Sequence, residues 1–250
     1  MHSIRQALFQ HQTWDPERAK RFFKTAPGSY GEHDRFIGVS VPVLRKLASV
    51  FTEVPKAVLS KSLSSPFNEE RFLALLILQK QYEKGNSITR DKVYHFYKDH
   101  LAWVNNWNLV DLSAPSILGA YVWDKDRFIL DRLSHSERLW DRRIAMVATL
   151  YFIRKNDLEW TFKIALSLQK DTHDLIHKAV GWMLREAGKR NQEVLTQFLL
   201  QHASHMPKTM LRYATEAFAH KDAFYFPQKE LMNLKECGTV PEQSAERNTS

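Results

Sequence analysis

The chain has 250 residues, a formal net charge of +8 and one cysteine, Cys237. This length suits one domain or two small ones, and 44% apolar with 26% charged residues is ordinary for a folded, soluble protein. A single cysteine excludes an internal disulfide framework and a multi-cysteine zinc site. No apolar run is long enough to span a bilayer, and residues 1–9 lack the apolar stretch of a signal peptide. We therefore expect a cytoplasmic protein without a membrane segment.

The charge is concentrated in the first 220 residues. Residues 221–250 hold four basic and five acidic side chains, which leaves 32 basic and 23 acidic side chains, a net charge of +9, for the rest. A folded body this basic favours a polyanionic partner such as nucleic acid.

The apolar residues follow a helical period almost throughout the chain, and no series of alternating strands is present. We expect an all-α fold. The pattern predicts clear helices over 68–83, 103–122, 137–155, 158–168, 172–190 and 192–202, and weaker ones over 41–50, 56–63, 89–100, 125–133 and 208–219. Beyond these we expect one short helix within 221–234 and a disordered tail at 238–250.

The helices recur in pairs. When the longer helices are aligned by their apolar pattern, the residues Arg71, Asn108, Arg143, Lys178 and Arg212 fall at one position, with spacings of 37, 35, 35 and 34. A period near 35 with two helices in each unit predicts an α-solenoid of HEAT-like antiparallel helix pairs.

Four of these five aligned residues are cations. Stacked repeats place equivalent positions side by side, so the cations predict a basic concave groove suited to a phosphate backbone. The alternative is that each cation pairs with an acid on a neighbouring helix. The spacing alone does not choose between them.

The segment WVNNWNLVDLSAP, residues 103–115, places Trp107 and Asp111 four residues apart, on one helix face. A carboxylate at the margin of an apolar stripe needs a partner or a task, because burying it unpaired costs several kcal/mol. One possibility is a buried ion pair with Arg143 of the following repeat. The other is a carboxylate that faces the groove and has a functional task there.

A second segment mixes aromatic and basic side chains. Lys178, Trp182, Arg185 and Lys189 follow one another at spacings of four, three and four, which places them on one face of a helix. Such interleaving suits nucleic acid, since rings pack on bases and sugars while cations hold phosphates. A tryptophan at helical spacing is otherwise a core residue.

Together these motifs resemble those of the AlkD-type DNA alkylation repair proteins, which are HEAT-like repeat DNA glycosylases. The resemblance rests on Trp-Asn-Leu-Val-Asp at 107–111, on Arg143, on Lys-Ala-Val-Gly-Trp-Met-Leu-Arg-Glu at 178–186, and on FFKTAPGSYGEHDRFIGVSVPVLRKLA at 22–48. It covers residues 1–218 and defines a repeat domain there, with 219–250 as a C-terminal extension.

The resemblance implies a monofunctional DNA glycosylase that hydrolyses the N-glycosidic bond of positively charged alkylpurines, of the 3-methyladenine and 7-methylguanine type, in duplex DNA. It implies base excision repair of alkylation damage, with Asp111 as the catalytic residue, Trp107 and Trp182 lining the cleft and Arg143 contacting the DNA backbone. Ser40 departs from the longer polar side chain of some members, which affects the expected contacts to the opposite strand.

From their spacing we add Lys178, Arg185 and Lys189 as backbone contacts. We expect no cofactor, no metal, a monomer, and association with the nucleoid when DNA is bound. The alternative function is a non-catalytic HEAT-like repeat protein that binds damaged or branched DNA, and a protein-binding repeat scaffold is a third.

Overall fold

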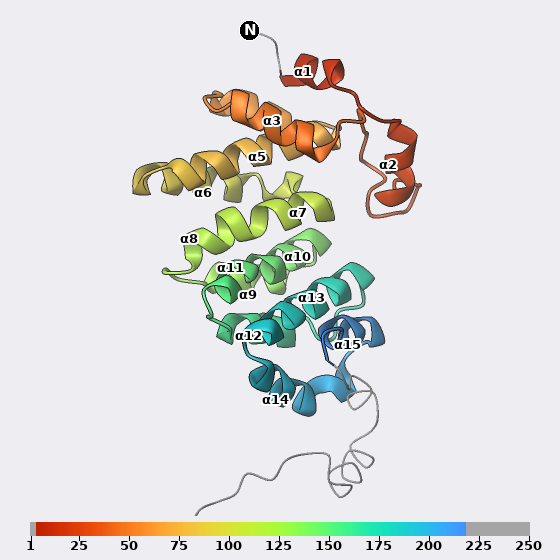
Figure 1. Ribbon diagram of the computed structural model, residues 1–250, viewed down its shortest axis with the longest axis vertical. Helices are drawn as coiled ribbons and strands as arrows, with labels where there is room; N and C mark the ends of the chain where they lie inside the picture. Colours follow the sequence, from red (N-terminus) through yellow and green to blue (C-terminus); the bar gives the residue numbers. More distant parts are fainter. Residues whose placement is uncertain (1–3, 219–250) are drawn as a thin grey trace, which may run out of the picture.

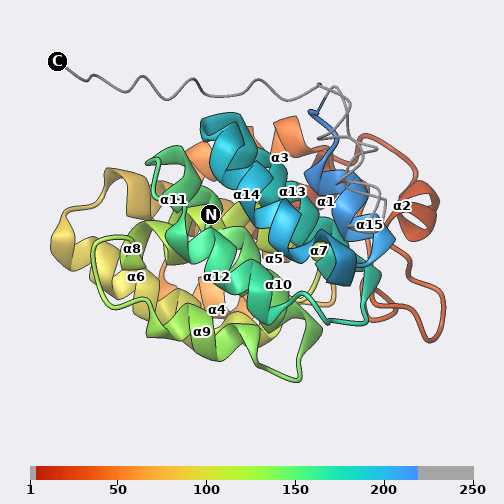
Figure 2. The same ribbon diagram turned by 90° about the horizontal axis from the view of Figure 1, so that it is seen from below.

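The computed structural model describes residues 4–218. Figure 1 shows their helices stacked in chain order, from α1 at one end to α14 and α15 at the other. Figure 2 shows the stack from below, with α2 at one edge and α6 at the opposite edge. The α-helices are α1 (Ile4–Gln10), α2 (Pro16–Phe22), α3 (Val41–Val50), α4 (Lys56–Leu63), α5 (Asn68–Lys84), α6 (Ser87–Asp99), α7 (Trp107–Ser113), α8 (Ala120–Val122), α9 (Phe128–Ser134), α10 (Leu139–Ala148), α11 (Leu150–Arg154), α12 (Glu159–Ser167), α13 (Asp174–Arg190), α14 (Gln192–His202) and α15 (Lys208–Ala214).

One helix of each pair belongs to a continuous inner column. In this column α3 contacts α5, and α7, α10, α13 and α15 follow, each packed on the one before. The five residues aligned from the sequence lie on α5, α7, α10, α13 and α15, one on each. The predicted all-α solenoid is therefore confirmed, and residues 4–218 contain no β-strand.

The helix predicted over 103–122 begins four residues late and is not uniform. Asn106 caps α7, because its side-chain oxygen accepts a hydrogen bond of 2.7 Å from the backbone N–H of Trp107. After α7 the chain widens into a π-helical turn, Ala114–Gly119, before α8. Pro115 lies in this turn and has no N–H to donate to the preceding turn, which favours such an irregularity.

Other boundaries also differ from the prediction. The helix expected over 137–155 is two helices, α10 and α11, separated at Thr149, whose hydroxyl donates to the carbonyl of Met146. The sequence pattern missed α1 and α2, because seven residues are too few to establish a helical period.

The last predicted helices lie partly or wholly beyond what the structure covers. The helix expected over 208–219 ends at Ala214 in α15, and residue 219 falls outside the described range. The short helix within 221–234 and the tail at 238–250 also lie outside it. Within residues 4–218, no helix combines the length and the apolar character needed to cross a membrane.

Candidate functional site

Asp111 and Arg143 form an ion pair between two neighbouring helices of the inner column. The Arg143 Nε–H donates to Asp111 Oδ1 at 3.0 Å, and Nη2 donates to Oδ2 at 2.8 Å. The third nitrogen, Nη1, donates to the backbone carbonyl of Leu175 at 2.7 Å, just inside the start of α13. One guanidinium therefore ties α7, α10 and α13 together and holds the carboxylate by both oxygens.

The two partners differ in their exposure. The side chain of Arg143 is 6% exposed, whereas that of Asp111 is 21% exposed. Burial raises the pKa of Asp111 above its ordinary value, and the nearby charge and hydrogen bonds of Arg143 oppose that rise. The ion pair that the sequence left open is thus formed, and the Asp111 side chain is only partly buried.

Trp107 lies one turn before Asp111, in a cluster of aromatic rings. Its ring stacks on Phe23 with centroids 5.2 Å apart and an interplanar angle of 13°, and Phe22 meets it edge-on at 5.3 Å. Phe36 also stacks on Phe23, with centroids 4.7 Å apart. The end of α2 and the segment after it therefore fix the indole at the N-terminus of α7.

Tyr30 is a site residue that the sequence analysis did not single out. Its hydroxyl has Trp107 as a hydrogen-bond partner, and its ring packs edge-on against Trp140 at 5.9 Å. Burial raises the pKa of Tyr30, and the positive charges of Lys178 and Arg143 partly offset this. Tyr30 therefore contacts both Trp107 and Trp140, which lie on α7 and α10. The only available sequence signal was its position in the segment 22–48.

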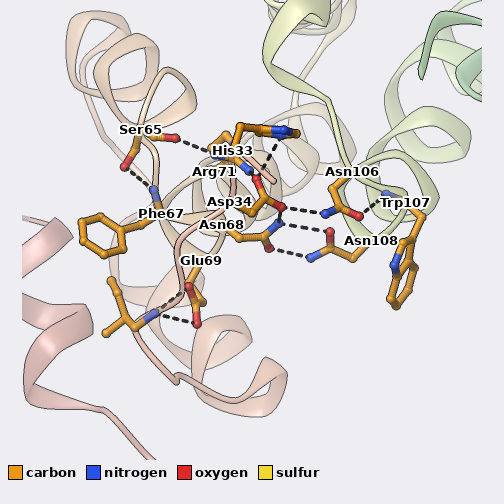
Figure 3. Close-up of polar contacts among 11 residues, drawn as sticks. His33, Asp34, Ser65, Phe67, Asn68, Glu69, Arg71, Asn106, Trp107 and Asn108 are labelled. Atoms are coloured by element: carbon orange, nitrogen blue, oxygen red, sulfur yellow. Dashed lines mark hydrogen bonds and ion pairs between the residues drawn. The ribbon is translucent and has the colours of Figure 1, made fainter. Parts of the chain in front are cut away.

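A buried polar network anchors this segment to α5 and α7 (Figure 3). Asp34 accepts hydrogen bonds from the amide of Asn68 at 2.8 Å and from the amide of Asn106 at 2.6 Å, and it forms an ion pair with Arg71. Asn108 and Asn68 exchange amide hydrogen bonds, the shorter being 2.7 Å. The same Asn106 caps α7, so Asp34 helps to set where the helix of Trp107 and Asp111 begins.

The charge of Asp34 is compensated although its side chain is wholly buried. Burial alone would raise the pKa of this carboxyl. The contacts of His33, Arg71, Asn106 and Asn68 outweigh it, and the pKa lies below its ordinary value. His33 approaches Asp34 Oδ1 at 3.1 Å from a partly exposed position. None of these residues was predicted to act together, because they come from three separate segments.

The five aligned positions do not form a solvent-facing row of cations. Arg71 is 1% exposed and pairs with Asp34, and Arg143 is 5% exposed and pairs with Asp111. Asn108 is uncharged, and Arg212 lies over the ring of Tyr213. For Arg71 and Arg143 the alternative reading, pairing with an acid on another element, is the correct one. The predicted row of one solvent-facing cation in each repeat is therefore not formed at Arg71 and Arg143.

The remaining predicted residues lie together on α13. Lys178 pairs with Asp174 at 2.7 Å, and Trp182 is half-buried one turn further along. Arg185 forms an ion pair with Glu216, and Lys189 pairs with Glu186 at 2.7 Å. All three cations thus have acidic partners in this structure. Residues 4–218 contain no group of three or more His, Cys, Asp or Glu side chains placed to hold a metal ion.

Comparison with known proteins gives a consistent result. The family model described as DNA alkylation repair enzyme matches residues 4–218. A predicted DNA alkylation repair enzyme from Enterococcus faecalis is similar in structure, with a TM-score of 0.64 at 16% identity, covering 82% of this chain and 95% of that one. AlkD2 from Streptococcus mutans has a TM-score of 0.52 at 15% identity, covering 81% of this chain and 97% of that one. No curated protein matches the chain. At such identities the structural likeness concerns the fold.

Proposed function

The chain belongs to the DNA alkylation repair enzyme family, and on that premise we propose that it is a monofunctional DNA glycosylase. Its substrate is duplex DNA that carries positively charged alkylpurines of the 3-methyladenine and 7-methylguanine type, and it acts as a monomer. Asp111 is the catalytic residue, and Trp107 and Trp182 line the cleft. The reaction is hydrolysis of the N-glycosidic bond, as in base excision repair.

The chemistry needs one well-placed anion. An N-alkylated purine already carries a positive charge, so it leaves as a neutral base without a general acid. In the transition state positive charge develops on the deoxyribose, as in glycoside hydrolysis. A carboxylate near C1′ stabilises that charge and orients the attacking water. The indole face of Trp107 adds cation–π attraction of about 0.5–2 kcal/mol.

The observation that carries this proposal is the state of the Asp111 carboxylate. The Asp111 side chain is 21% exposed, and both oxygens of its carboxylate are held by a guanidinium that is itself 6% exposed. A fixed carboxylate is what electrostatic catalysis requires, because the anion need not reorganise as charge develops. We therefore assign Arg143 a positioning role, in place of the backbone contact expected from the sequence.

The cations of α13 remain our candidates for phosphate contacts. The side chains of Lys178 and Lys189 are 39% and 53% exposed, and that of Arg185 is 23% exposed. Exposed ion pairs of this kind contribute little to stability, so a phosphate can replace the acidic partner at small cost. Binding through them predicts an affinity for duplex DNA that falls steeply with salt.

The test is release of free base from methylated duplex DNA by the full chain. We expect release of 7-methylguanine and 3-methyladenine, and little or no release of uracil or hypoxanthine. The physical reason is that a neutral base needs a proton before it can leave, and the proposed site supplies an anion and no acid. Chromatography of the released bases measures this. Equal release of neutral lesions would contradict the proposal.

A second candidate is a non-catalytic repeat protein that binds damaged or branched DNA. The observation that favours it is the same ion pair, because Arg143 engages both oxygens of Asp111 and partly neutralises its charge. Salt-dependent binding of duplex or branched DNA without any base release would establish this second function in place of the first.

The pH dependence of the rate tests the positioning role of Arg143. Arg143 opposes the burial that raises the pKa of Asp111. Because only the ionised carboxylate stabilises the sugar cation, the wild-type rate is expected to rise with pH, with its half-maximum above 3.8. In Arg143→Gln the pKa rises further, so the half-maximum moves to higher pH. A purely structural role would lower the rate at every pH without moving the half-maximum.

A further inference from the structure

A pocket of about 490 Å³ lies beside the Asp111 site, between α2, the segment leading into α3, and the helices α5 and α7. This is within the usual volume range of small-molecule sites. Its lining includes Asn108 of α7 but not Asp111. We call it the aromatic pocket, after the rings that line it, which are Trp14, Phe22, Phe23, Phe36 and Phe72.

The rings of the aromatic pocket are held in place by their neighbours. Phe23 stacks on Phe36 at 4.7 Å, and Phe22 meets Phe23 edge-on at 5.1 Å while remaining 64% exposed. Trp14 is fixed by Gly38, whose carbonyl accepts from its backbone N–H at 3.1 Å. Gly38 has a φ of 95° and passes so close to the Trp14 carbonyl that a Cβ would come within 2.2 Å of it. Only glycine permits this approach.

Glu69 lines the same pocket and is 4% exposed. Its carboxylate accepts hydrogen bonds from the backbone N–H groups of Ile37, Gly38 and Val39, at 2.9 to 3.4 Å. Among residues 4–218, however, no Lys, Arg or His forms an ion pair with it. The backbone dipoles satisfy its lone pairs but leave a net negative charge.

The neighbouring buried acids differ from Glu69 in this respect. Asp34 pairs with Arg71, and Glu70, the next residue of α5, pairs with Arg5 at 2.5 Å. Burial raises the pKa of Glu69, and its hydrogen bonds to backbone N–H groups only partly counter this. A buried acid without a cationic partner, in a pocket also lined by aromatic rings, is an electrostatic environment that favours a cation.

We propose that the aromatic pocket binds a flat organic monocation of nucleoside size, such as an N-alkylated purine nucleoside. Aromatic rings attract cations, and Glu69 supplies a negative charge that no Lys, Arg or His among residues 4–218 pairs with. The exposed guanidinium of Arg18 also lines the pocket and would repel such a ligand. This site is separate from the Asp111 cleft, and the inference goes beyond the proposed glycosylase function.

The experiment compares 1-methyladenosine, a cation at neutral pH, with neutral adenosine, by calorimetric titration of the full wild-type chain. We expect 1-methyladenosine to bind at least about tenfold more tightly, since ring faces and a carboxylate both favour the charged form. Equal affinities would overturn the proposal and indicate a pocket for neutral rings. Absence of binding by either nucleoside would overturn it as well.

Variants locate the binding. Phe22→Ala removes an exposed ring and is expected to weaken binding of 1-methyladenosine, whereas Arg18→Ala removes the repelling charge and is expected to strengthen it. Weaker binding by Arg18→Ala would mean an anion site and would overturn the proposal. Glu69→Gln should abolish the preference for the cation, and if that variant does not fold, the other two still decide.

Asp111→Asn separates this inference from the proposed function. An unchanged affinity for 1-methyladenosine supports the aromatic pocket, whether or not the protein releases bases from DNA. Loss of the preference in Asp111→Asn would place the cation at Asp111 and overturn the inference. A trinucleotide that carries 1-methyladenine identifies the source of the cation: tighter binding than the nucleoside indicates a nucleic acid strand, and equal or weaker binding a free nucleoside.

Discussion

Replacing Asp111 by asparagine is expected to lower the rate of 7-methylguanine release about a thousandfold. At about 4 Å and an effective dielectric constant near 20, a carboxylate attracts a developing positive charge by about 4 kcal/mol. Losing that attraction in the transition state corresponds to roughly three orders of magnitude in rate. The measurement is single-turnover release of 7-methylguanine from duplex DNA at neutral pH, so that product release does not obscure the chemical step.

A matched control is Asp131→Asn. Asp131 is an aspartate with a 28% exposed side chain, and like Asp111 it has a basic partner, Lys163 at 3.6 Å. It lies on α9, outside the inner column that carries the candidate site. The same chemical change there is expected to leave the release rate within about twofold of wild type, and duplex affinity unchanged.

Asp111→Asn also removes the charge opposite Arg143, so its thermal unfolding must be measured alongside the rate. Asparagine still offers one oxygen to the guanidinium, and the Leu175 carbonyl remains as a second acceptor. A folded variant that binds duplex DNA normally but no longer releases base supports catalysis by Asp111. Equal rates for the variant and the wild type would contradict the catalytic assignment and favour the non-catalytic repeat protein.

Much of the fold was predictable because its signal is local. The inner helices repeat every 34 to 37 residues, and the structure places the aligned residues on successive helices of one column. Each prediction needed only the apolar period within a single helix. The helices over 41–50, 56–63 and 192–202 have the predicted bounds, those of α3, α4 and α14.

The sequence did not decide which residues the charged side chains pair with, because these partners are distant in the chain. Arg71 and Asp34 are 37 residues apart, and Arg143 and Asp111 are 32 apart. A helical pattern places each side chain on a face but does not identify what lies opposite. For the same reason the sequence predicted a basic stripe where the structure buries Arg71 and Arg143, and it missed Tyr30 beside Trp107.

The site was therefore only partly predictable. The sequence brought out Asp111 and Trp107 by their four-residue spacing, and it offered the pair with Arg143 as one of two alternatives. It did not reveal that a loop residue, Asp34, sets the start of α7 through Asn106. Capping fixes the helical register, so the position of the catalytic candidate depends on a charge 77 residues earlier in the chain.

Replacing Asp34 by alanine is expected to destabilise the protein by about 3–5 kcal/mol. Arg71 is 1% exposed and would be left as a buried charge without its acidic partner. The amides of Asn68 and Asn106 would lose an acceptor as well. The midpoint of urea-induced unfolding, followed by helical circular dichroism, measures the loss. If the alanine variant does not accumulate, Asp34→Asn provides a milder loss of charge.

The pH dependence distinguishes this charge from a simple packing effect. The pKa of Asp34 is lowered in the folded protein, so its ionised form is favoured by folding. The stabilisation is therefore fully present above the unfolded pKa, about 3.9, and is lost as the pH falls through the lower folded pKa. The difference in unfolding free energy between wild type and Asp34→Asn is expected to shrink over that acid range. A difference that stays constant with pH would contradict a charge-based role.

A surface acid supplies the comparison. Asp124 pairs with Lys125 at 3.1 Å, with 66% and 48% of the two side chains exposed. Asp124→Ala is expected to cost less than about 1 kcal/mol, because water screens an exposed pair. Because Asn106 depends on Asp34 and caps the helix of Asp111, Asp34→Asn should also slow base release while it remains folded, whereas Asp124→Ala should not. Normal release by a destabilised Asp34→Asn would mean that the start of α7 is fixed without this carboxylate.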